Sequence, residues 1–253
     1  MNNRFAVIGK NVSNSMSPHL FNWMYKKLEW DTAEGFSYDA ISVDNEEDIE
    51  AAIEEYRGVN VTMPYKKSVT KFTVRFESIF PNVNCLIHEW DGWIGRNTDW
   101  GAFLMTLYDE YIDPRAHKFL LFGDGDVSKT IQKCLSGNIE VVNRDKEKFQ
   151  RLVEEQNDPA IIINCTPLTH ESPLLSSNIY EKHILYDLNY HRSVFLEEGK
   201  SNGNRTVDGV SMFVYQALAS ICNWQARPAM KHAAKTIGLD NIKAFVREQL
   251  NST

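Results

Sequence analysis

Two segments in the first hundred residues carry hydroxyl, amide and ammonium groups that could bind an oxygen-rich anion. The first, Ser15-Met16-Ser17-Pro18, places two hydroxyls where a helix is predicted to begin, and the second, Asn60-Val61-Thr62-Met63-Pro64-Tyr65-Lys66, follows a predicted strand. Hydroxyls at a helix N-terminus suit a carboxylate, but helix capping explains Ser17 without any ligand and is the role that the sequence alone favours. Open α/β sheets bind ligands beyond the carboxyl ends of their strands. Lys66 is therefore either a ligand-binding group or an ordinary solvated lysine.

A glycine loop in the middle of the chain is typical of a dinucleotide site. Gly123-Asp124-Gly125-Asp126-Val127-Ser128 joins a predicted strand to a predicted helix. Glycines there let the backbone approach a pyrophosphate that faces the helix N-terminus. Any tight strand-to-helix turn also favours glycine, and Asp126 would repel a phosphate unless its side chain points away.

Charged residues follow this loop at the spacing where dinucleotide-binding folds recognise the ribose. The segment Asn143-Arg144-Asp145-Lys146-Glu147-Lys148 begins about 20 residues after Gly123. Arg144 and Lys148 could hold the 2′-phosphate of NADP, whereas Asp145 keeps NAD possible. An ordinary solvated charge run explains the same residues equally well.

A carboxylate lies at the junction of the two halves of the chain. It belongs to Asp99, in Asn97-Thr98-Asp99, just before a predicted helix. The same carboxylate would serve either in a site between two domains or as the cap of that helix.

Strand and helix patterns alternate along the chain and predict an α/β protein with mostly parallel sheets. In the first half we expect strands over residues 4–8, 37–43 and 58–63 and helices over 17–30 and 46–56, the first of them begun by Ser17 and Pro18. A hairpin over residues 84–94 is expected to turn at Asp91-Gly92. In the second half, helices are expected over 100–111, 128–135, 211–224, 228–237 and 241–250, and strands over 118–122, 140–143, 160–164 and 184–188.

Composition excludes several classes of protein. The 253 residues include 27 Lys and Arg against 34 Asp and Glu, a net charge of −7 that disfavours a nucleic-acid partner. Apolar runs are too short to span a membrane and no signal peptide is evident, so we expect a cytoplasmic protein. The four cysteines form no CxxC pair, and no metal site is expected.

Together these motifs resemble the shikimate dehydrogenase family over nearly the whole chain. The matching segments are Ser15-Met16-Ser17-Pro18 with Asn22, Asn60 to Lys66, Asn84-Cys85-Leu86, Asn97-Thr98-Asp99, the loop at Gly123, Asn143-Arg144, Ile163 to Pro167, Tyr186 to Tyr190, and Gly209 to Ala217. Each motif is weak alone, but their common order is specific.

The resemblance implies two α/β domains and a reversible, NADPH-dependent reduction of 3-dehydroshikimate to shikimate in aromatic amino acid biosynthesis. The substrate domain would comprise residues 1–100 and return with the C-terminal helices of 209–253. A Rossmann-like, NADP-binding domain would occupy residues 101–208. The small-molecule substrate would be the only partner of a monomer or homodimer.

By match to the family's positions, the resemblance also implies roles for individual residues. Lys66 and Asp99 would be catalytic. Substrate binding would involve Ser15, Ser17, Asn60, Thr62, Lys66, Asn84, Asp99, Tyr190 and Gln216. Cofactor binding would involve Gly123, Gly125, Asp126, Val127, Asn143, Arg144, Lys148, Thr166, Gly209 and Met212.

Two alternatives follow from positions where the chain departs from the family pattern. Asp145 stands where the family has a hydroxyl residue, which leaves open an NAD-using relative that oxidises quinate or a related ring acid. Asp124 and Asp126 place two carboxylates in the pyrophosphate loop, which leaves open a non-catalytic, shikimate-binding relative with impaired cofactor binding.

Overall fold

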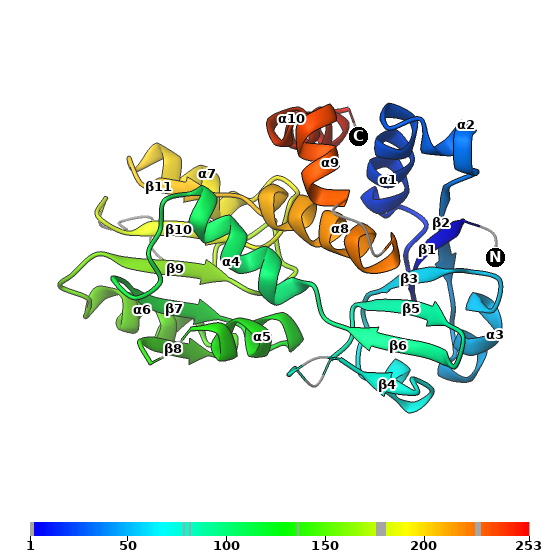
Figure 1. Ribbon diagram of the computed structural model, residues 1–253. Helices are drawn as coiled ribbons and strands as arrows, with labels where there is room; N and C mark the ends of the chain where they lie inside the picture. Colours follow the sequence, from blue (N-terminus) through cyan, green and yellow to red (C-terminus); the bar gives the residue numbers. More distant parts are fainter. Residues whose placement is uncertain are drawn as a thin grey trace. The chain divides into compact units, whose positions relative to one another are not determined.

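The computed structural model describes residues 3–77, 79–80, 82–135, 137–175, 181–225 and 229–252 (Figure 1). The chain forms two compact units. Unit 1 comprises Met1–Thr98 and Gln216–Thr253, and unit 2 comprises Asp99–Tyr215. The chain therefore passes between units after Thr98 and again after Tyr215, whereas the sequence-based boundaries fall after residues 100 and 208.

Unit 1 contains a six-stranded sheet in the order β2-β1-β3-β5-β6-β4. Its strands are β1 (Arg4–Gly9), β2 (Ser37–Ser42), β3 (Gly58–Val61), β4 (Arg75–Phe76), β5 (Cys85–Glu89) and β6 (Gly92–Arg96). The first three strands are parallel, while β5 pairs antiparallel with both β3 and β6. This sheet is thus mixed, because the predicted hairpin pairs antiparallel with β3 and lies between β3 and the edge strand β4.

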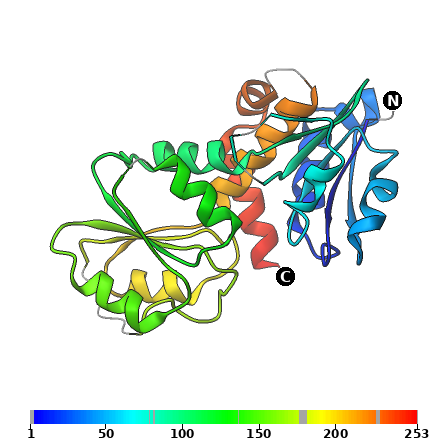
Figure 2. The same cartoon turned by 90° about the horizontal axis from the view of Figure 1, so that it is seen from below.

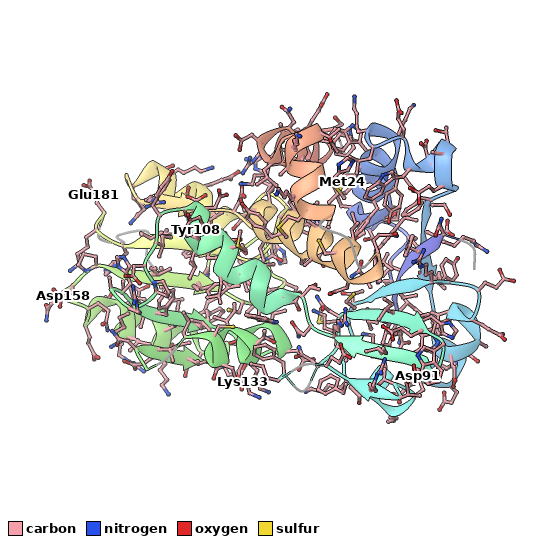
Figure 3. All side chains as sticks on the ribbon, in the orientation of Figure 1. Met24, Asp91, Tyr108, Lys133, Asp158 and Glu181 are labelled. Atoms are coloured by element: carbon pink, nitrogen blue, oxygen red, sulfur yellow. The ribbon has the colours of Figure 1, made fainter. Side chains whose placement is uncertain are left out.

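The β5–β6 hairpin turns one residue earlier than the sequence predicted. Glu89 pairs with Gly92, so Trp90 and Asp91 form the turn, and Gly92 is the first residue of β6. Figure 3 labels Asp91 at this turn. A φ of 125° at Gly92 places it in a conformation that glycine adopts without a steric penalty.

The helices of unit 1 lie on both sides of its sheet. They are α1 (Met16–Lys27), α2 (Trp30–Glu34), α3 (Ile49–Ile53), α9 (Ala229–Thr236), α10 (Leu239–Asn251) and the second half of α8 (Val210–Gln225), with 3-10 turns η1 (Glu46–Asp48) and η2 (Ser68–Lys71). Residues of α3 and η2 join the core on one face, and α1 and α8 supply aromatic rings to the other. Pro228, the predicted start of the helix over 228–237, lies outside the described residues.

The first helix begins before its predicted start. Ser15, not Ser17, is the N-cap, and its Oγ accepts a hydrogen bond from the Ser17 N–H at 3.2 Å. Pro18 is then the third helical residue. A backbone N–H at that position would have no acceptor within the helix, so the lack of one in proline costs no hydrogen bond. The helix ends at Lys27, and Glu29, with φ of 58°, separates it from α2.

The predicted helix over 46–56 is shorter and broken. It consists of η1 followed by α3, which ends at Ile53. Carboxylates at Glu46, Glu50 and Glu54 follow one another at four-residue spacing, and like charges at that spacing destabilise a helix. Ile49 and Ile53 are nevertheless buried and fix the segment to the sheet.

Unit 2 contains a parallel five-stranded sheet in the order β11-β10-β9-β7-β8. Its strands are β7 (Lys118–Phe122), β8 (Ile139–Val142), β9 (Ala160–Asn164), β10 (Ile184–Asp187) and β11 (Arg205–Val207), and its helices are α4 (Asp99–Asp109), α5 (Asp126–Cys134), α6 (Lys146–Glu154), α7 (Val194–Ser201) and the start of α8. Helices cover both faces of the sheet (Figure 2), as the predicted α/β class requires.

Three elements of unit 2 were not predicted from the sequence. They are α6, α7 and β11, which are short and rich in charged residues. Phe149 of α6 and Phe195 of α7 are fully buried against Leu120 and Ile162 of the central strands. Tertiary packing of these few apolar side chains therefore stabilises helices whose local sequence gives little signal.

No helix in the described part of the chain is long and apolar enough to cross a membrane.

The core of unit 1 depends on one close contact between a glycine and a tryptophan. Trp224 of α8 is buried, stacks on Phe5 with ring centroids 4.8 Å apart, and donates from Nε1 to the Leu86 carbonyl at 2.9 Å. A Cβ on Gly58 would lie 2.3 Å from the indole ring. Only glycine at this position of β3 lets the ring pack against the sheet.

We expect Gly58→Ala to lower the free energy of unfolding by about 1–3 kcal/mol, because the added methyl must displace the indole or the strand. Gly101→Ala is the control, since that glycine lies in α4 with open space around its Cβ position, and alanine there should be neutral or stabilising. Urea unfolding followed by tryptophan fluorescence measures both. Equal stability of Gly58→Ala and the parent would contradict the packing argument.

Candidate functional site

The hydroxyls of Ser15 and Ser17 have different surroundings. Ser15 Oγ is half-buried and used in the helix cap, whereas Ser17 is buried and its hydroxyl hydrogen-bonds the phenol of Tyr38. Burial raises the pKa of Tyr38 well above its usual value, and the Ser17 hydroxyl opposes that rise. The capping role that was predicted for Ser17 therefore belongs to Ser15.

Asn60 joins three elements of unit 1. Its Oδ1 accepts from the Tyr38 hydroxyl at 2.8 Å, and its Nδ2 donates to the Asn84 carbonyl at 3.1 Å and to Ser220 Oγ at 2.8 Å. Ser220 in turn donates to the backbone carbonyl of Gln216, one turn earlier on α8. Asn60 therefore helps to fix the positions of Tyr38, of the Asn84 backbone and of the helical turn from Gln216 to Ser220.

The backbone around Lys66 is held from both sides. Thr62 donates its N–H to the Ile8 carbonyl at 2.9 Å, and the buried Tyr65 donates its hydroxyl to the Val43 carbonyl at 2.7 Å. The Lys66 carbonyl accepts from the Val83 N–H at 2.7 Å. A half-buried ammonium is thereby carried on a fixed backbone close to the end of β3.

Asn84 holds the residue that precedes Asp99. Its Oδ1 accepts from the Thr98 N–H at 2.7 Å, and its Nδ2 donates to Thr98 Oγ1 at 2.9 Å. Asp99 is buried and is the first residue of α4. Asn84, predicted as a substrate ligand, is thus also a positioning residue for the chain that enters unit 2.

The glycine loop of unit 2 requires glycine at its first position. Gly123 has a φ of 103°, and a Cβ there would lie 2.8 Å from Thr166 Cγ2. Gly125 is the N-cap of α5, with open space at its Cβ position, and Asp126 and Val127 form the first turn of that helix. The loop thus leaves an open approach to the helix N-terminus, as a pyrophosphate site requires.

Both carboxylates of this loop are stabilised by the protein itself. Asp124 accepts from Gln132 Nε2 at 3.3 Å and lies 3.9 Å from Lys129 Nζ. Asp126 is half-buried at the first position of α5, where the helix dipole favours a negative charge. Lys129 therefore offsets part of the charge that would repel a phosphate.

Asp145 is a helix cap. Its Oδ1 accepts from the Lys148 N–H at 2.9 Å at the start of α6. Arg144 has a φ of 58°, and the side chains of Asn143, Arg144 and Lys148 are exposed. The capping role accounts for the Asp145 carboxylate, which in the sequence kept NAD possible. The side chains of Arg144 and Lys148 are exposed beside β8, where a ligand from solution could reach them.

Thr166, Gly209 and Tyr190 lie around the carboxyl ends of β9 and β10. Thr166 is buried and donates from Oγ1 to Asn164 at 2.8 Å, and the Gly209 N–H donates to the Asn189 carbonyl at 3.0 Å. The Tyr190 ring packs 4.6 Å from that of Phe213, and burial raises the pKa of its hydroxyl. Met212 is buried on the first turn of α8.

The predicted residues thus form two groups, one in each unit. Unit 1 carries Ser15, Ser17, Asn60, Thr62, Lys66, Asn84 and Gln216, and unit 2 carries Asp99, Tyr190 and the predicted cofactor residues. Sequence reasoning gave no role to Asn164, Asn189, Ser193 or the carboxylate of Asp187, which form a buried polar network in unit 2. The signal for Asn164 and Asp187 is a polar residue that ends an apolar strand. Within the described residues, no cluster of His, Cys, Asp and Glu could hold a metal ion.

Comparison with known proteins defines the class. Residues 7–78 match the model of the shikimate dehydrogenase substrate binding domain. The chain is 30% identical over 252 residues to a shikimate dehydrogenase (NADP(+)) of Clostridium botulinum, covering 87% of this chain and 95% of that protein. It therefore belongs to the shikimate dehydrogenase family.

Two further comparisons agree. A shikimate dehydrogenase (NADP(+)) of Staphylococcus aureus is 28% identical over 269 residues, with 95% of this chain and 99% of that protein covered. The crystal structure of a chorismate mutase/shikimate 5-dehydrogenase fusion protein from Clostridium acetobutylicum superposes with a TM-score of 0.83 at 25% identity over 100% of both chains. The sequence-based resemblance and the α/β class, with its Rossmann-like part, are confirmed.

The cap at α6 makes a stability prediction. Asp145→Ala should lower the free energy of unfolding by about 1 kcal/mol, because the Lys148 N–H loses its acceptor. Asp145→Ser retains an N-cap acceptor and should stay within about 0.5 kcal/mol of the parent. Urea denaturation followed by circular dichroism gives both values, and an Asp145→Ala protein as stable as the parent would remove the capping role.

Proposed function

We propose that the chain is an NADP-dependent oxidoreductase that reversibly reduces 3-dehydroshikimate to shikimate, a step of aromatic amino acid biosynthesis. The observation that carries this proposal is identity of 30% to a shikimate dehydrogenase (NADP(+)) over 95% of that protein's length. The residues expected to do the chemistry are retained, including Lys66 and Asp99. The active form is proposed to be a cytoplasmic monomer or homodimer.

The division of the chain into two units supports separate binding of substrate by unit 1 and of cofactor by unit 2. Unit 1 would bind the substrate, with Ser15 and Ser17 near the carboxylate and Thr62, Asn84 and Gln216 near ring hydroxyls. The network of Asn60 described above would keep these groups in register, because it ties β2, β3 and α8 together.

Unit 2 would bind NADP at the N-terminus of α5 and beside β8. The open Cβ position of Gly125 suits the close approach of a pyrophosphate to the start of α5, and Gly123 supplies the left-handed turn before it. Arg144 and Lys148 would bind the 2′-phosphate, a task that suits exposed cations. Because Asp145 caps α6, its carboxylate is oriented toward its own helix and is less available to an NAD ribose.

The reduction needs a hydride and a proton, and bound NADPH would supply the hydride. Negative charge then develops on the carbonyl oxygen of the substrate. The ammonium of Lys66 would stabilise that charge and deliver a proton from Nζ, which it would recover from the hydroxyl in the reverse direction. Asp99 is proposed to orient the ammonium and to accept a hydrogen bond from a ring hydroxyl.

The direct test is nicotinamide absorbance after mixing the purified protein with shikimate and NADP. Parallel reactions contain NAD in place of NADP and quinate in place of shikimate. We expect NADPH to form from shikimate and the other combinations to be slower. Preference for NAD with quinate would identify the alternative paralogue, and a folded protein that is silent in every reaction but binds shikimate in calorimetry would refute the enzymatic proposal.

Lys66→Ala should lower kcat by roughly 10²–10⁴-fold, the range for loss of a general acid. Lys67→Ala, at the exposed neighbouring lysine, is the matched control and should retain near-parent turnover. Circular dichroism verifies that both variants are folded. Near-parent kcat in the Lys66→Ala protein would exclude Lys66 from proton transfer.

A further inference from the structure

A fully buried carboxylate lies at the carboxyl end of β10. Asp187 is 0% exposed, and its two oxygens accept four hydrogen bonds. Oδ1 accepts from the backbone N–H of Asn189 at 2.9 Å and from its Nδ2 at 2.7 Å. Oδ2 accepts from Ser193 Oγ at 2.5 Å and from Asn164 Nδ2 at 3.1 Å. Burial raises the pKa of Asp187, and these donors oppose the rise.

The first arm of this network ends at Thr166. Because Asn164 aims its Nδ2 at the carboxylate, its Oδ1 must face the other way, where it accepts from Thr166 N at 3.0 Å and Thr166 Oγ1 at 2.8 Å. Asn189 Nδ2 also donates to the Thr166 carbonyl at 2.9 Å. The amide orientations that Asp187 imposes thus fix the backbone and the hydroxyl of Thr166.

The second arm ends at Gly209. The carbonyl of Asn189 accepts from the Gly209 N–H at 3.0 Å, and a Cβ on Gly209 would lie 2.2 Å from the Leu188 carbonyl oxygen. The segment after β10 therefore lies against the start of α8. Tyr190 follows directly on this segment and packs on Phe213 of that helix.

We propose that Asp187 is a positioning residue for the nicotinamide half of the dinucleotide. It holds Asn164 and Asn189 in one orientation, and these place Thr166 and Gly209, two residues expected to line the cofactor. Asp187 touches neither cofactor nor substrate, since its oxygens face protein donors. The inference rests on the proposed function and deepens it, because it assigns a requirement for cofactor binding to a residue outside the contact set.

Asp187→Asn tests the proposal. The substitution keeps the shape but replaces one acceptor oxygen by an amino group, which then faces the amino group of Asn164 or Asn189. We expect the KM for NADP and the Kd for NADPH to rise about tenfold, the consequence of leaving a buried donor unpaired. The KM for shikimate should stay within about twofold, because the proposed substrate residues of unit 1 are unaffected.

Two controls separate positioning from loss of stability. Ser193→Ala removes one donor but leaves the carboxylate and both amides in place, and Thr106→Val removes a buried hydroxyl of α4 that bonds the Ala102 carbonyl. Both should keep the KM for NADP within about threefold of the parent, whatever their unfolding midpoints. If Asp187→Asn behaves like these controls, or raises both KM values equally, the proposal is overturned.

Asn189→Ala provides a second test if Asp187→Asn does not fold. It leaves Asp187 with the Ser193, Asn164 and backbone donors but breaks the bond to the Thr166 carbonyl, so the Kd for NADPH should rise several-fold. An unchanged Kd would overturn the proposal. Titration of NADPH fluorescence measures Kd without turnover, so a parent that binds NADPH but oxidises no shikimate would refute the proposed function and leave this result standing.

Discussion

Buried polar groups at the carboxyl ends of the strands must be hydrogen-bonded. Much of the side-chain arrangement in the two groups of predicted site residues, one in each unit, depends on that constraint. Desolvated amides and carboxylates are costly without partners. In unit 1 the constraint acts at Asn60, whose amide links Tyr38, Asn84 and Ser220. In unit 2 it acts at Asp187, whose carboxylate collects donors from Asn164, Asn189 and Ser193. Each network fixes residues that would face a ligand.

The same constraint separates residues that bind from residues that position. Ser15 caps α1, which leaves the Ser17 hydroxyl for the Tyr38 phenol, and Asn84 holds Thr98 next to Asp99. The Asn97-Thr98-Asp99 motif therefore combines Thr98, which Asn84 holds in place, with Asp99, which is predicted to be catalytic. A helix cap similarly explains Asp145, and an ion pair with Lys129 explains how Asp124 is tolerated in the glycine loop.

The order of motifs predicted the family, and the alternation of strand and helix patterns predicted the α/β class and the parallel sheet of unit 2. Long apolar strands such as residues 118–122 and 160–164 carried this signal, because a parallel strand covered on both faces is apolar throughout. The sequence also singled out Gly123, whose positive φ and contact with Thr166 require glycine. The roles of the individual site residues stay predictions.

The sequence by itself determined which chemical groups are present and in what order, since motif spacing follows from strand and helix lengths. Only the tertiary structure decided which of these groups are hydrogen-bonded or packed inside the protein itself. Ser15 replaced Ser17 as the cap, the hairpin turned at Trp90-Asp91, and charged α6 and α7 formed because Phe149 and Phe195 pack on the sheet. The Asp187 network joins side chains from two strands and the loops beyond them. Its hydrogen bonds depend on distances in space, which no local sequence pattern encodes.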